Sequence, residues 1–545
     1  MASTSLEFHL SNMISNFLSE LARLIFVFWS WWCDGLAENP TSRVIPTLVA
    51  ATLLAISLYA WLIKKPFTSV PPLPPGPPGL PLLGNLPFLE PDLHRYFAKL
   101  SEIYGPIMKL QLGRKVCVVI SSPSLAKQVL KDYDAIFSNR DPTVAAKAST
   151  YGGDIAWSPN GPEWRKLRKI LIQEMMSKTS LDACHTFRRQ EVRKMVKEVY
   201  AKAGSSINIG EQMFLTVLNV IMRMTWGASL NEEDSIRVGI QFRQVVDEFV
   251  YLWGAPNVSD LFPVLARFDL QGVESKVKKL SSWFDKMFGS LIDSRTKDQQ
   301  AGGEKKEEEK GSNKDFLQIL LDDKTSLSMN QVKALLLDTF LGGTHTTSTT
   351  IEWLMAELLL HPEIMRKACT ELEEVVGKDN IVEEFHISKL HYLDAILKET
   401  LRLHPALPLL VPRSPCTTQT ISEYTIPKGS RVLFNVWAMQ RDPEAWENPL
   451  EFQPERFMRD PGKGEYRGNN FNYLPFGSGR RICPGISLAE KMILYVVSTL
   501  LYSFEWNIPH GATLDLSEKF GLVTKMQEPL IAIPIAKYSS SDHYL

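Results

Sequence analysis

Ten residues near the carboxyl end, Phe476 to Gly485, constrain this chain more than any other stretch. They hold three glycines, two arginines and one cysteine, Cys483, directly before an apolar run that predicts a helix. Glycines let a backbone turn and approach a bound group without a clash at Cβ. A cysteine near a helix start is biased toward its thiolate. The loop therefore predicts a metal ligand or a nucleophile, with a buried packing cysteine as the plainer alternative.

The spacing of the residues in this loop favours a metal ligand over a packing cysteine. The pattern Phe476-x-x-Gly479-x-Arg481-x-Cys483-x-Gly485 resembles the haem-binding signature of the cytochrome P-450 family. The resemblance implies that Cys483 is the axial ligand of haem b iron, a thiolate that favours O–O cleavage. It also implies that Arg481 holds a haem propionate, that Phe476 packs beside the sulfur, and that Gly479 belongs to the haem-binding loop.

Three more residues are implied as haem contacts by the same resemblance. Trp164 and Arg168 lie four positions apart and share one face of a predicted helix, which by itself indicates only a surface helix. Within the family pattern they match the helix that binds a haem propionate, and arginine suits this role because its planar fork bonds carboxylates bidentately. Arg413 matches a further arginine that contacts a propionate.

A long helix is predicted from Ser328 to Leu360, with Gly342-Gly-Thr-His-Thr-Thr347 in its middle. Two glycines inside a helix cost about 1 kcal/mol each relative to alanine, so a kinked buried helix is one interpretation. The run also resembles the oxygen-activation groove of the same family, in which Thr346 matches the catalytic alcohol.

One residue of that run departs from the family pattern. His345 stands where the family usually has aspartate or glutamate. An imidazole can carry protons because its reference pKa of about 6.5 is close to neutral, but it contributes no negative charge. We therefore expect Thr346 and His345 to be the catalytic side chains of an altered proton relay.

The family resemblance also implies a buried structural network. Glu399 and Arg402 share a helix face, and such a pair alone is usually solvated and weak. Together with Arg456 they match the family's Glu–Arg–Arg network, which locks the core around the haem loop.

The length and composition of the chain fit this assignment. It has 545 residues, an apolar fraction of 44%, a net charge of −1 that gives no hint of nucleic acid, and six scattered cysteines that predict free thiols. The resemblance covers nearly everything from Pro71 onward. It implies a mainly α fold with small β-sheets, the triangular, helix-rich cytochrome P-450 fold, with residues 82–545 as one haem-thiolate monooxygenase domain.

The amino-terminal segments predict attachment to a membrane. Residues 44–63 are uncharged and long enough to cross a bilayer, and two lysines follow at once, which places the catalytic domain in the cytosol. A removable signal peptide is the alternative. Residues 1–43 suit an interfacial helix, with a targeting role left open, and residues 64–81 form a basic, proline-rich hinge. We expect a single-pass protein of the endoplasmic reticulum.

The substrate cavity is predicted to have an aliphatic wall. Alignment with family segments places five residues at it, namely Phe340, Gly343, Leu407, Leu409 and Leu522. Apolar walls suit a compact lipophilic ligand, although any of these residues singly could pack in the core instead. The chain resembles plant microsomal members that modify specialised metabolites, so we expect a mono- or sesquiterpenoid substrate, with a flavonoid or phenolic as the alternative.

The expected activity is a monooxygenase reaction, with one atom of dioxygen entering the substrate. Electrons come from NADPH through the flavins of a separate reductase, because this chain lacks a nucleotide-binding fingerprint. A haem-thiolate isomerase or dehydratase acting on lipid hydroperoxides, and a haem or lipid-binding protein without turnover, are the competing hypotheses.

Overall fold

The computed structural model describes residues 51–52, 54–55, 71–228, 232–301, 315–322, 325–378, 380–538 and 544. Residues 51, 52, 54 and 55 are helical. The rest of the predicted anchor (44–63), the predicted extension (1–43) and the hinge up to residue 70 lie outside the described residues. Those three predictions, and the division of the chain into segments, therefore stay predictions.

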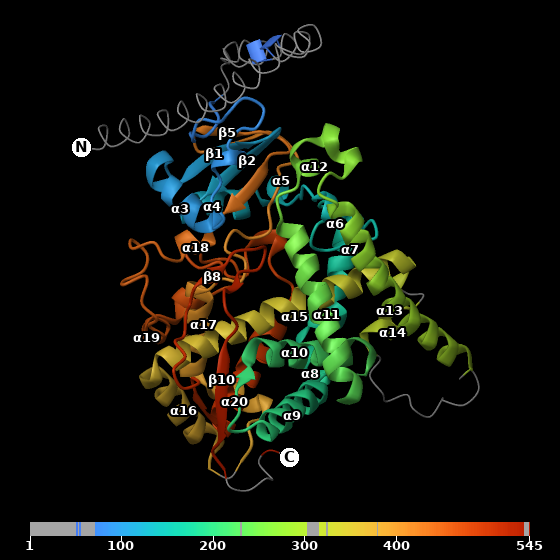
Figure 1. Cartoon of the computed structure of the whole chain (residues 1–545), viewed down its shortest axis with the longest axis vertical. Helices are drawn as coiled ribbons and strands as arrows, with labels where there is room; N and C mark the ends of the chain where they lie inside the picture. Colours follow the sequence, from blue (N-terminus) through green and yellow to red (C-terminus); the bar gives the residue numbers. More distant parts are fainter. Residues whose placement is uncertain are drawn as a thin grey trace, which may run out of the picture.

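Helices make up most of the described chain, and the mainly α fold predicted from the sequence is confirmed (Figure 1). They are α3 (Leu93–Tyr104), α4 (Pro123–Lys127), α5 (Asp134–Phe137), α6 (Val144–Ser149), α7 (Pro162–Ile170), α8 (Lys178–Ala183), α9 (His185–Ala201), α10 (Ile209–Trp226), α11 (Glu232–Gly254), α12 (Val258–Leu261), α13 (Val273–Ala301), α14 (Phe316–Leu320), α15 (Met329–Leu360), α16 (Pro362–Val376), α17 (His391–Leu403), α18 (Val436–Met439), α19 (Glu455–Arg459) and α20 (Ile486–Ser503).

The strands form small sheets. They are β1 (Ile107–Leu112), β2 (Lys115–Ile120), β3 (Ile207–Asn208), β4 (Gln419–Ile421), β5 (Tyr424–Ile426), β6 (Arg431–Phe434), β7 (Phe504–Asn507), β8 (Glu518–Lys519), β9 (Lys525–Met526) and β10 (Ile531–Ala536). Strands β1 and β2 form an antiparallel hairpin, and β6 pairs with β2 in parallel. Strand β10 lies between β3 and β7, while β4–β5 and β8–β9 are separate hairpins.

Helix α15 runs through the middle of the fold (Figure 1). Its start is fixed by a capping box, in which the Ser328 hydroxyl accepts from the Gln331 amide and the Gln331 side chain accepts from the Ser328 amide. It ends at Leu360, directly before the turn that leads into Pro362, since a proline ring disfavours the helical conformation for the residue before it.

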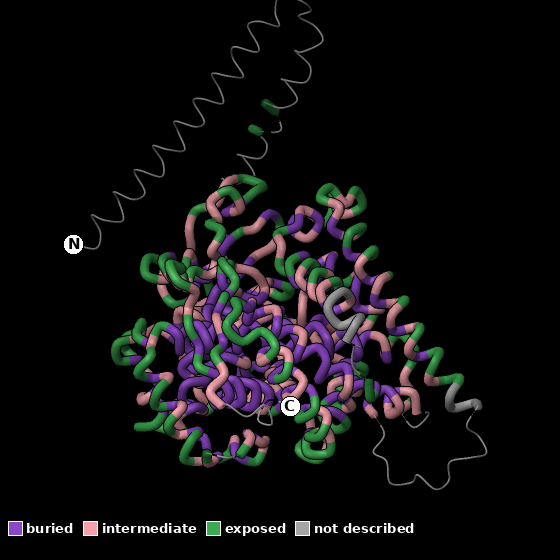
Figure 2. The backbone as a smooth tube through the Cα atoms, turned by 60° about the horizontal axis from the view of Figure 1, so that its bottom comes forward, coloured by how far each residue is buried: buried purple, intermediate pink, exposed green. Residues whose placement is uncertain are grey.

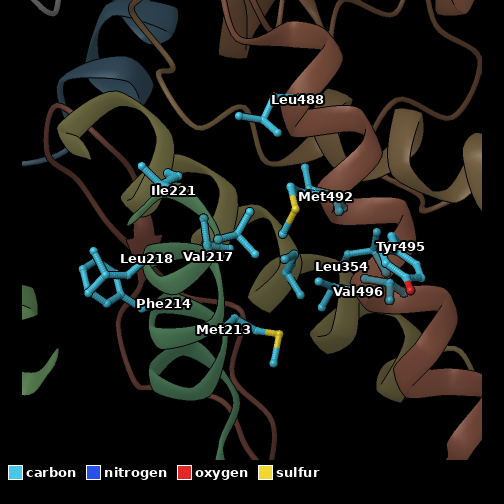
Figure 3. Close-up of a cluster of buried hydrophobic side chains, with 14 of the residues drawn as sticks. Met213, Phe214, Val217, Leu218, Ile221, Leu354, Leu488, Met492, Tyr495 and Val496 are labelled. Carbon is cyan, nitrogen blue, oxygen red and sulfur yellow. The ribbon is translucent and has the colours of Figure 1, made fainter. Parts of the chain in front are cut away.

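Apolar packing on both sides of α15 forms the main core. Figure 3 shows Val217 of α10 and Met492 and Val496 of α20 directed toward Leu354 of α15. All four side chains are buried, and Figure 2 shows buried backbone concentrated in the interior of the described fold. This packing fixes the central helix against two neighbours, which is the precondition for a precise site on it.

Helix α20 is long and apolar enough to cross a membrane by length and composition, and within the described residues it is the single such helix. However, 72% of it is buried inside the fold. Its apolar surface is therefore accounted for by the protein core, against α15 and α9.

We predict that Leu354→Ala destabilises the protein by about 2–5 kcal/mol, because it removes a fully buried side chain and leaves a cavity. A drop in the thermal unfolding midpoint measures this loss. Leu360→Ala is the matched control, since Leu360 on the same helix is 39% exposed. Equal shifts in the two variants would contradict the assignment of Leu354 to the core.

Candidate active site

The loop from Phe476 to Gly485 is closed by its own backbone. The amide of Cys483 donates to the carbonyl of Phe476 at 3.0 Å, so the ends of the loop meet just before α20 begins. Gly479 has a φ of +68°, and a Cβ there would lie 2.4 Å from the backbone oxygen of Leu130. Only glycine allows this close approach, which seats the loop on the segment between α4 and α5.

Cys483 is intermediate between buried and exposed as a residue, and it has no disulfide partner among the described residues. Burial raises the pKa of Cys483, while the Gly485 amide and the charge of Arg168 lower it. Protein groups alone therefore leave this thiol protonated near neutral pH. A bound metal ion removes that proton, because coordination to a cation deprotonates a thiol.

Arginine side chains converge beside the loop. Arg481 donates to the carbonyls of Ser138 at 2.7 Å and Ile155 at 3.0 Å, and its guanidinium lies 4.0 Å from the ring centre of Trp164. Arg168 donates to the carbonyl of Ile482 at 2.5 Å. The indole of Trp164 donates to the same Ile155 carbonyl at 3.0 Å. The motifs that the sequence singled out thus lie together, with Trp164 and Arg168 from α7 and Arg481 from the loop.

Two more arginines complete this cluster. Arg413 donates to Asp134 at 2.8 Å and also to the carbonyl of Ser478. Arg140 donates to the carbonyls of Ala156 at 3.0 Å and Pro412 at 2.8 Å. We name Arg140, Arg168, Arg413 and Arg481 the arginine cluster.

The arginine cluster carries more positive charge than its neighbours balance. Burial and then the charge of Arg413 lower the pKa of Arg481 to about 9. Burial, followed by the charges of Arg481 and Arg413, lowers the pKa of Arg140 well below its usual value. Within the described residues, the hydrogen bonds donated by Arg140, Arg168 and Arg481 go to neutral carbonyls. The cluster is therefore suited to carboxylates of a ligand.

The residues of the predicted groove lie in the middle of α15. The hydroxyl of Thr346 donates to the carbonyl of Gly342 at 2.7 Å, and a Cβ on Gly342 would meet nothing within 4 Å. Thr344 and Thr350 make the same bond to the carbonyl four residues earlier, at 2.7 and 2.9 Å. Such bonds draw carbonyls away from the helix ladder and bend helices. Gly342 and Thr346 thus offer an accessible polar notch in the mostly buried middle of the helix.

The neighbouring His345 has a different environment. It is 4% exposed, and its Nε2 lies 3.2 Å from Oδ1 of Asp247 on α11. Burial lowers the pKa of His345, so the imidazole is neutral at pH 7. Its nearest ionic partner is on α11, outside the Gly342–Thr346 notch.

The sequence of residues 74–533 matches the family described as cytochrome P-450. This chain belongs to the cytochrome P-450 family. The flavonoid 3'-monooxygenase of Petunia hybrida is 37% identical over 512 residues, which is 90% of this chain and 97% of that protein. The geraniol 8-hydroxylase of Swertia mussotii is 39% identical over 504 residues, or 89% of this chain and 98% of that protein.

A solved structure supports the fold. A zebra fish cytochrome P-450 with abiraterone superposes with a TM-score of 0.69 at 28% identity, covering 82% of this chain and all of that chain. Cytochromes P-450 hold haem through a cysteine thiolate and take electrons from a separate reductase. This cytochrome P-450 is a haem-thiolate monooxygenase of the plant type.

The residues present fit haem on two observations. The arginine cluster has unbalanced positive charge that the propionate carboxylates of haem would neutralise. The loop also presents a thiol with few local groups to ionise it, which bound iron would do.

The predicted structural network of this cytochrome P-450 is assembled in the fold. Arg402 binds both oxygens of Glu399 at 2.8 and 2.9 Å, and both side chains are fully buried. Arg456 donates to the same carboxylate at 3.0 Å. Arg402 also donates to the carbonyls of Gln440 and Pro449, at 2.9 and 2.7 Å. Each donor in this buried network has a partner, which is what such a network requires to be stable.

The residues predicted at the cavity wall differ in their surroundings. Phe340 is fully buried, with its ring 5.0 Å from that of Trp226 across the α10 interface. A Cβ on Gly343 would lie 2.6 Å from a methyl group of Ile221, so this glycine serves helix packing. Leu409 packs in the small core beside β1 and β2. Both Leu407 and Leu522 are partly buried against the main core.

Sequence reasoning missed two residues of the site. Arg140 stands in a loop without a motif, and nothing in its neighbours marks it. Asp338 lies on α15 and accepts from the Ile155 amide at 2.6 Å, which ties the loop before α7 to the central helix. It stands eight residues before Thr346, a spacing close to two helical turns, and this was an available signal.

We predict that Glu399→Gln costs about 3–5 kcal/mol, because it leaves Arg402 buried without a counter-charge. Chemical or thermal unfolding measures the loss. Glu374→Gln is the control, since Glu374 is exposed on α16. If both variants unfold alike, the network does not stabilise the fold.

We further predict that Arg140→Gln and Arg168→Gln each lower the haem content of the purified protein, because each removes a donor and a charge from the arginine cluster. The ratio of haem to protein absorbance gives the measurement. Arg165→Gln serves as the control, as Arg165 is exposed on the same helix as Arg168. Full haem content in both cluster variants would contradict a propionate-binding role.

Proposed function

We propose that this cytochrome P-450 hydroxylates a small lipophilic plant metabolite, a mono- or sesquiterpenoid. The accessible notch at Gly342 and Thr346 carries the proposal, since it offers a hydroxyl beside a glycine in the mostly buried middle of α15. The partly buried side chains Leu407 and Leu522 are aliphatic, and burial of apolar surface supplies affinity for such a ligand. The similarity to geraniol 8-hydroxylase supports the terpenoid class.

The chain's own residues take these roles in the proposal. Cys483 ligates the iron, and the arginine cluster with Trp164 holds the propionates. Haem, when bound, supplies the activation of dioxygen. The Thr346 hydroxyl, bonded to Gly342, holds a proton at the face where the substrate is oxidised. NADPH is used only through the separate reductase.

An exposed apolar surface supports the proposed attachment to a membrane, here placed at the endoplasmic reticulum. Val264, Phe268 and Leu270 follow α12 and are 69%, 56% and 61% exposed. The Arg114 amide donates to the carbonyl of Leu261, while the Gly113 amide donates to that of Leu83, so this segment and exposed Leu82–Leu83 meet at the same turn. An apolar patch of this kind marks a protein or membrane contact. It lies at the end of the fold that also carries β1, β2 and β5 (Figure 1).

A flavonoid substrate is the second candidate, favoured by the similarity to flavonoid 3'-monooxygenase. One experiment distinguishes the two candidate substrate classes. Membranes that contain the protein are given terpenoids and flavonoids, with and without NADPH and reductase, and products are identified by mass spectrometry. We expect oxygenated terpenoid only with NADPH. Flavonoid products alone would replace the proposed class, and products without NADPH would overturn the monooxygenase reaction.

We predict that Cys483→Ser abolishes the thiolate-type absorption band of the reduced carbon monoxide complex, because serine does not supply a thiolate. Cys369→Ser provides the control. The sulfur of Cys369 accepts a hydrogen bond from Lys537, and Cys369 lies on α16, outside the cysteine loop. Survival of the band in the Cys483→Ser protein would remove Cys483 from the ligand position.

A further inference from the structure

One carboxylate of the central helix reaches the segment that holds the arginine cluster. Asp338 lies on α15, and its Oδ2 accepts a hydrogen bond from the amide of Ile155 at 2.6 Å. The amide of the next residue, Ala156, also stabilises the charged form of this carboxylate. Two successive amides of the segment between α6 and α7 therefore converge on one side chain of α15.

The carbonyls of the same two residues accept hydrogen bonds from the site. The Ile155 carbonyl accepts from Arg481 and from the Trp164 indole, each at 3.0 Å. The Ala156 carbonyl accepts from Arg140 at 3.0 Å. Because the Ile155 carbonyl and the Ala156 amide belong to one planar peptide group, a shift of the amide moves the carbonyl with it. A single peptide group thus separates the carboxylate on α15 from a guanidinium group of the arginine cluster.

The segment between α6 and α7 is also held by its own side chains. Asp154, which is 2% exposed, accepts from the Trp157 amide at 3.1 Å and from the Ser158 amide at 2.7 Å. The Ser158 hydroxyl donates to the Asp154 carboxylate at 2.9 Å, and the Ser158 carbonyl accepts from Arg481. The segment is therefore a closed turn, and the carboxylate on α15 sets where this turn lies.

The two carboxylates of this region differ in their electrostatic surroundings. Burial and then the charge of Asp154 raise the pKa of Asp338 well above its ordinary value, which favours the neutral carboxyl. Burial lowers the pKa of Arg481 and of Arg140, and the charge of Asp154 counteracts this lowering. Asp154 is therefore the counter-charge of the arginine cluster here, whereas Asp338 serves as a hydrogen-bond acceptor.

We propose that Asp338 is a positioning residue for haem. It holds the amides of Ile155 and Ala156, whose carbonyls fix the places of the Arg481 and Arg140 side chains. Since the notch is on the same helix, α15 sets the haem donors and the notch relative to each other. This inference rests on the proposed function, because the arginine cluster is assigned there to the haem propionates. Asp338 acts through these peptide groups.

The test compares two variants of the purified, full-length, haem-containing protein. Asp338→Ala and Asp338→Asn both remove the ionisable group, but the second variant keeps an acceptor oxygen for the Ile155 amide. The measurement is the rate at which haem passes to an excess of apomyoglobin. We expect Asp338→Ala to release haem about three- to tenfold faster than Asp338→Asn, the range for one buried hydrogen bond. Asp338→Asn should release haem at close to the wild-type rate.

The midpoint potential of the haem iron gives a readout that general destabilisation would not change. Positive charge near haem stabilises the electron gained on reduction. We expect a lower potential in Asp338→Ala than in Asp338→Asn, because displaced guanidinium groups stabilise that electron less. Asp260→Ala is the matched control, since Asp260 accepts from the Val144 amide at 2.7 Å and so joins α12 to α6. This control should lower stability without changing haem release or potential.

Hydrogen exchange of the wild-type protein tests the first contact without any variant. The peptide that carries the Ile155 and Ala156 amides should exchange slowly, and it should stay slow in Asp338→Asn. Fast exchange of these amides in the wild-type protein would overturn the inference even if Asp338→Ala did not fold.

Two further results would overturn the positioning role. One is equal haem release and equal potential in the two Asp338 variants, and the other is an effect of Asp260→Ala as large as that of Asp338→Ala. Failure of the proposed function is recognised separately. Full haem content in Arg140→Gln and Arg168→Gln would remove the arginine cluster from haem binding. Haem loss in those variants, with no difference between the two Asp338 variants, would overturn only the positioning role.

Discussion

Buried positive charge is the constraint on which the rest of this structure depends. Guanidinium groups from four separate segments meet beside the cysteine loop, and the charges of Arg168, Arg413 and Arg481 lower the pKa of neighbouring guanidinium groups. The fold tolerates them because backbone carbonyls surround each planar group and the Trp164 ring lies against Arg481. That arrangement satisfies hydrogen bonds but leaves charge unbalanced. The protein and its haem are consequently interdependent, since binding an anionic cofactor to the native state adds to stability.

Helix α15 carries the second part of the candidate site, the Gly342–Thr346 notch. Packing against α10 and α20 fixes it on two sides, and its capping box fixes where it starts. Threonine hydroxyls along it bond to carbonyls of the previous turn, so the Gly342–Thr346 notch has a defined shape without a ligand. Rigid placement of a notch on a packed central helix is a form of preorganisation.

Site residues that belong to motifs with fixed spacing could be predicted from the sequence. Residues assigned to the site only by their position along a helix could not. Cys483, Arg481, Trp164 and Arg168 belong to patterns whose chemistry is readable, and the structure brings them together. Gly342 and Gly343 show the limit, because adjacent positions on a helix differ by about 100° and only one of them faces open space. Asp247 had no signal at all, since its partner is almost a hundred residues away and the pairing is purely tertiary.

The contact between Gly343 and Ile221 has a consequence for how this protein can change. A methyl group of Ile221 occupies the position that a side chain at 343 would need. The two residues therefore share one volume between α10 and α15. A methyl gained at position 343 has to displace the end of the Ile221 side chain, which favours a smaller residue at position 221 in the same protein.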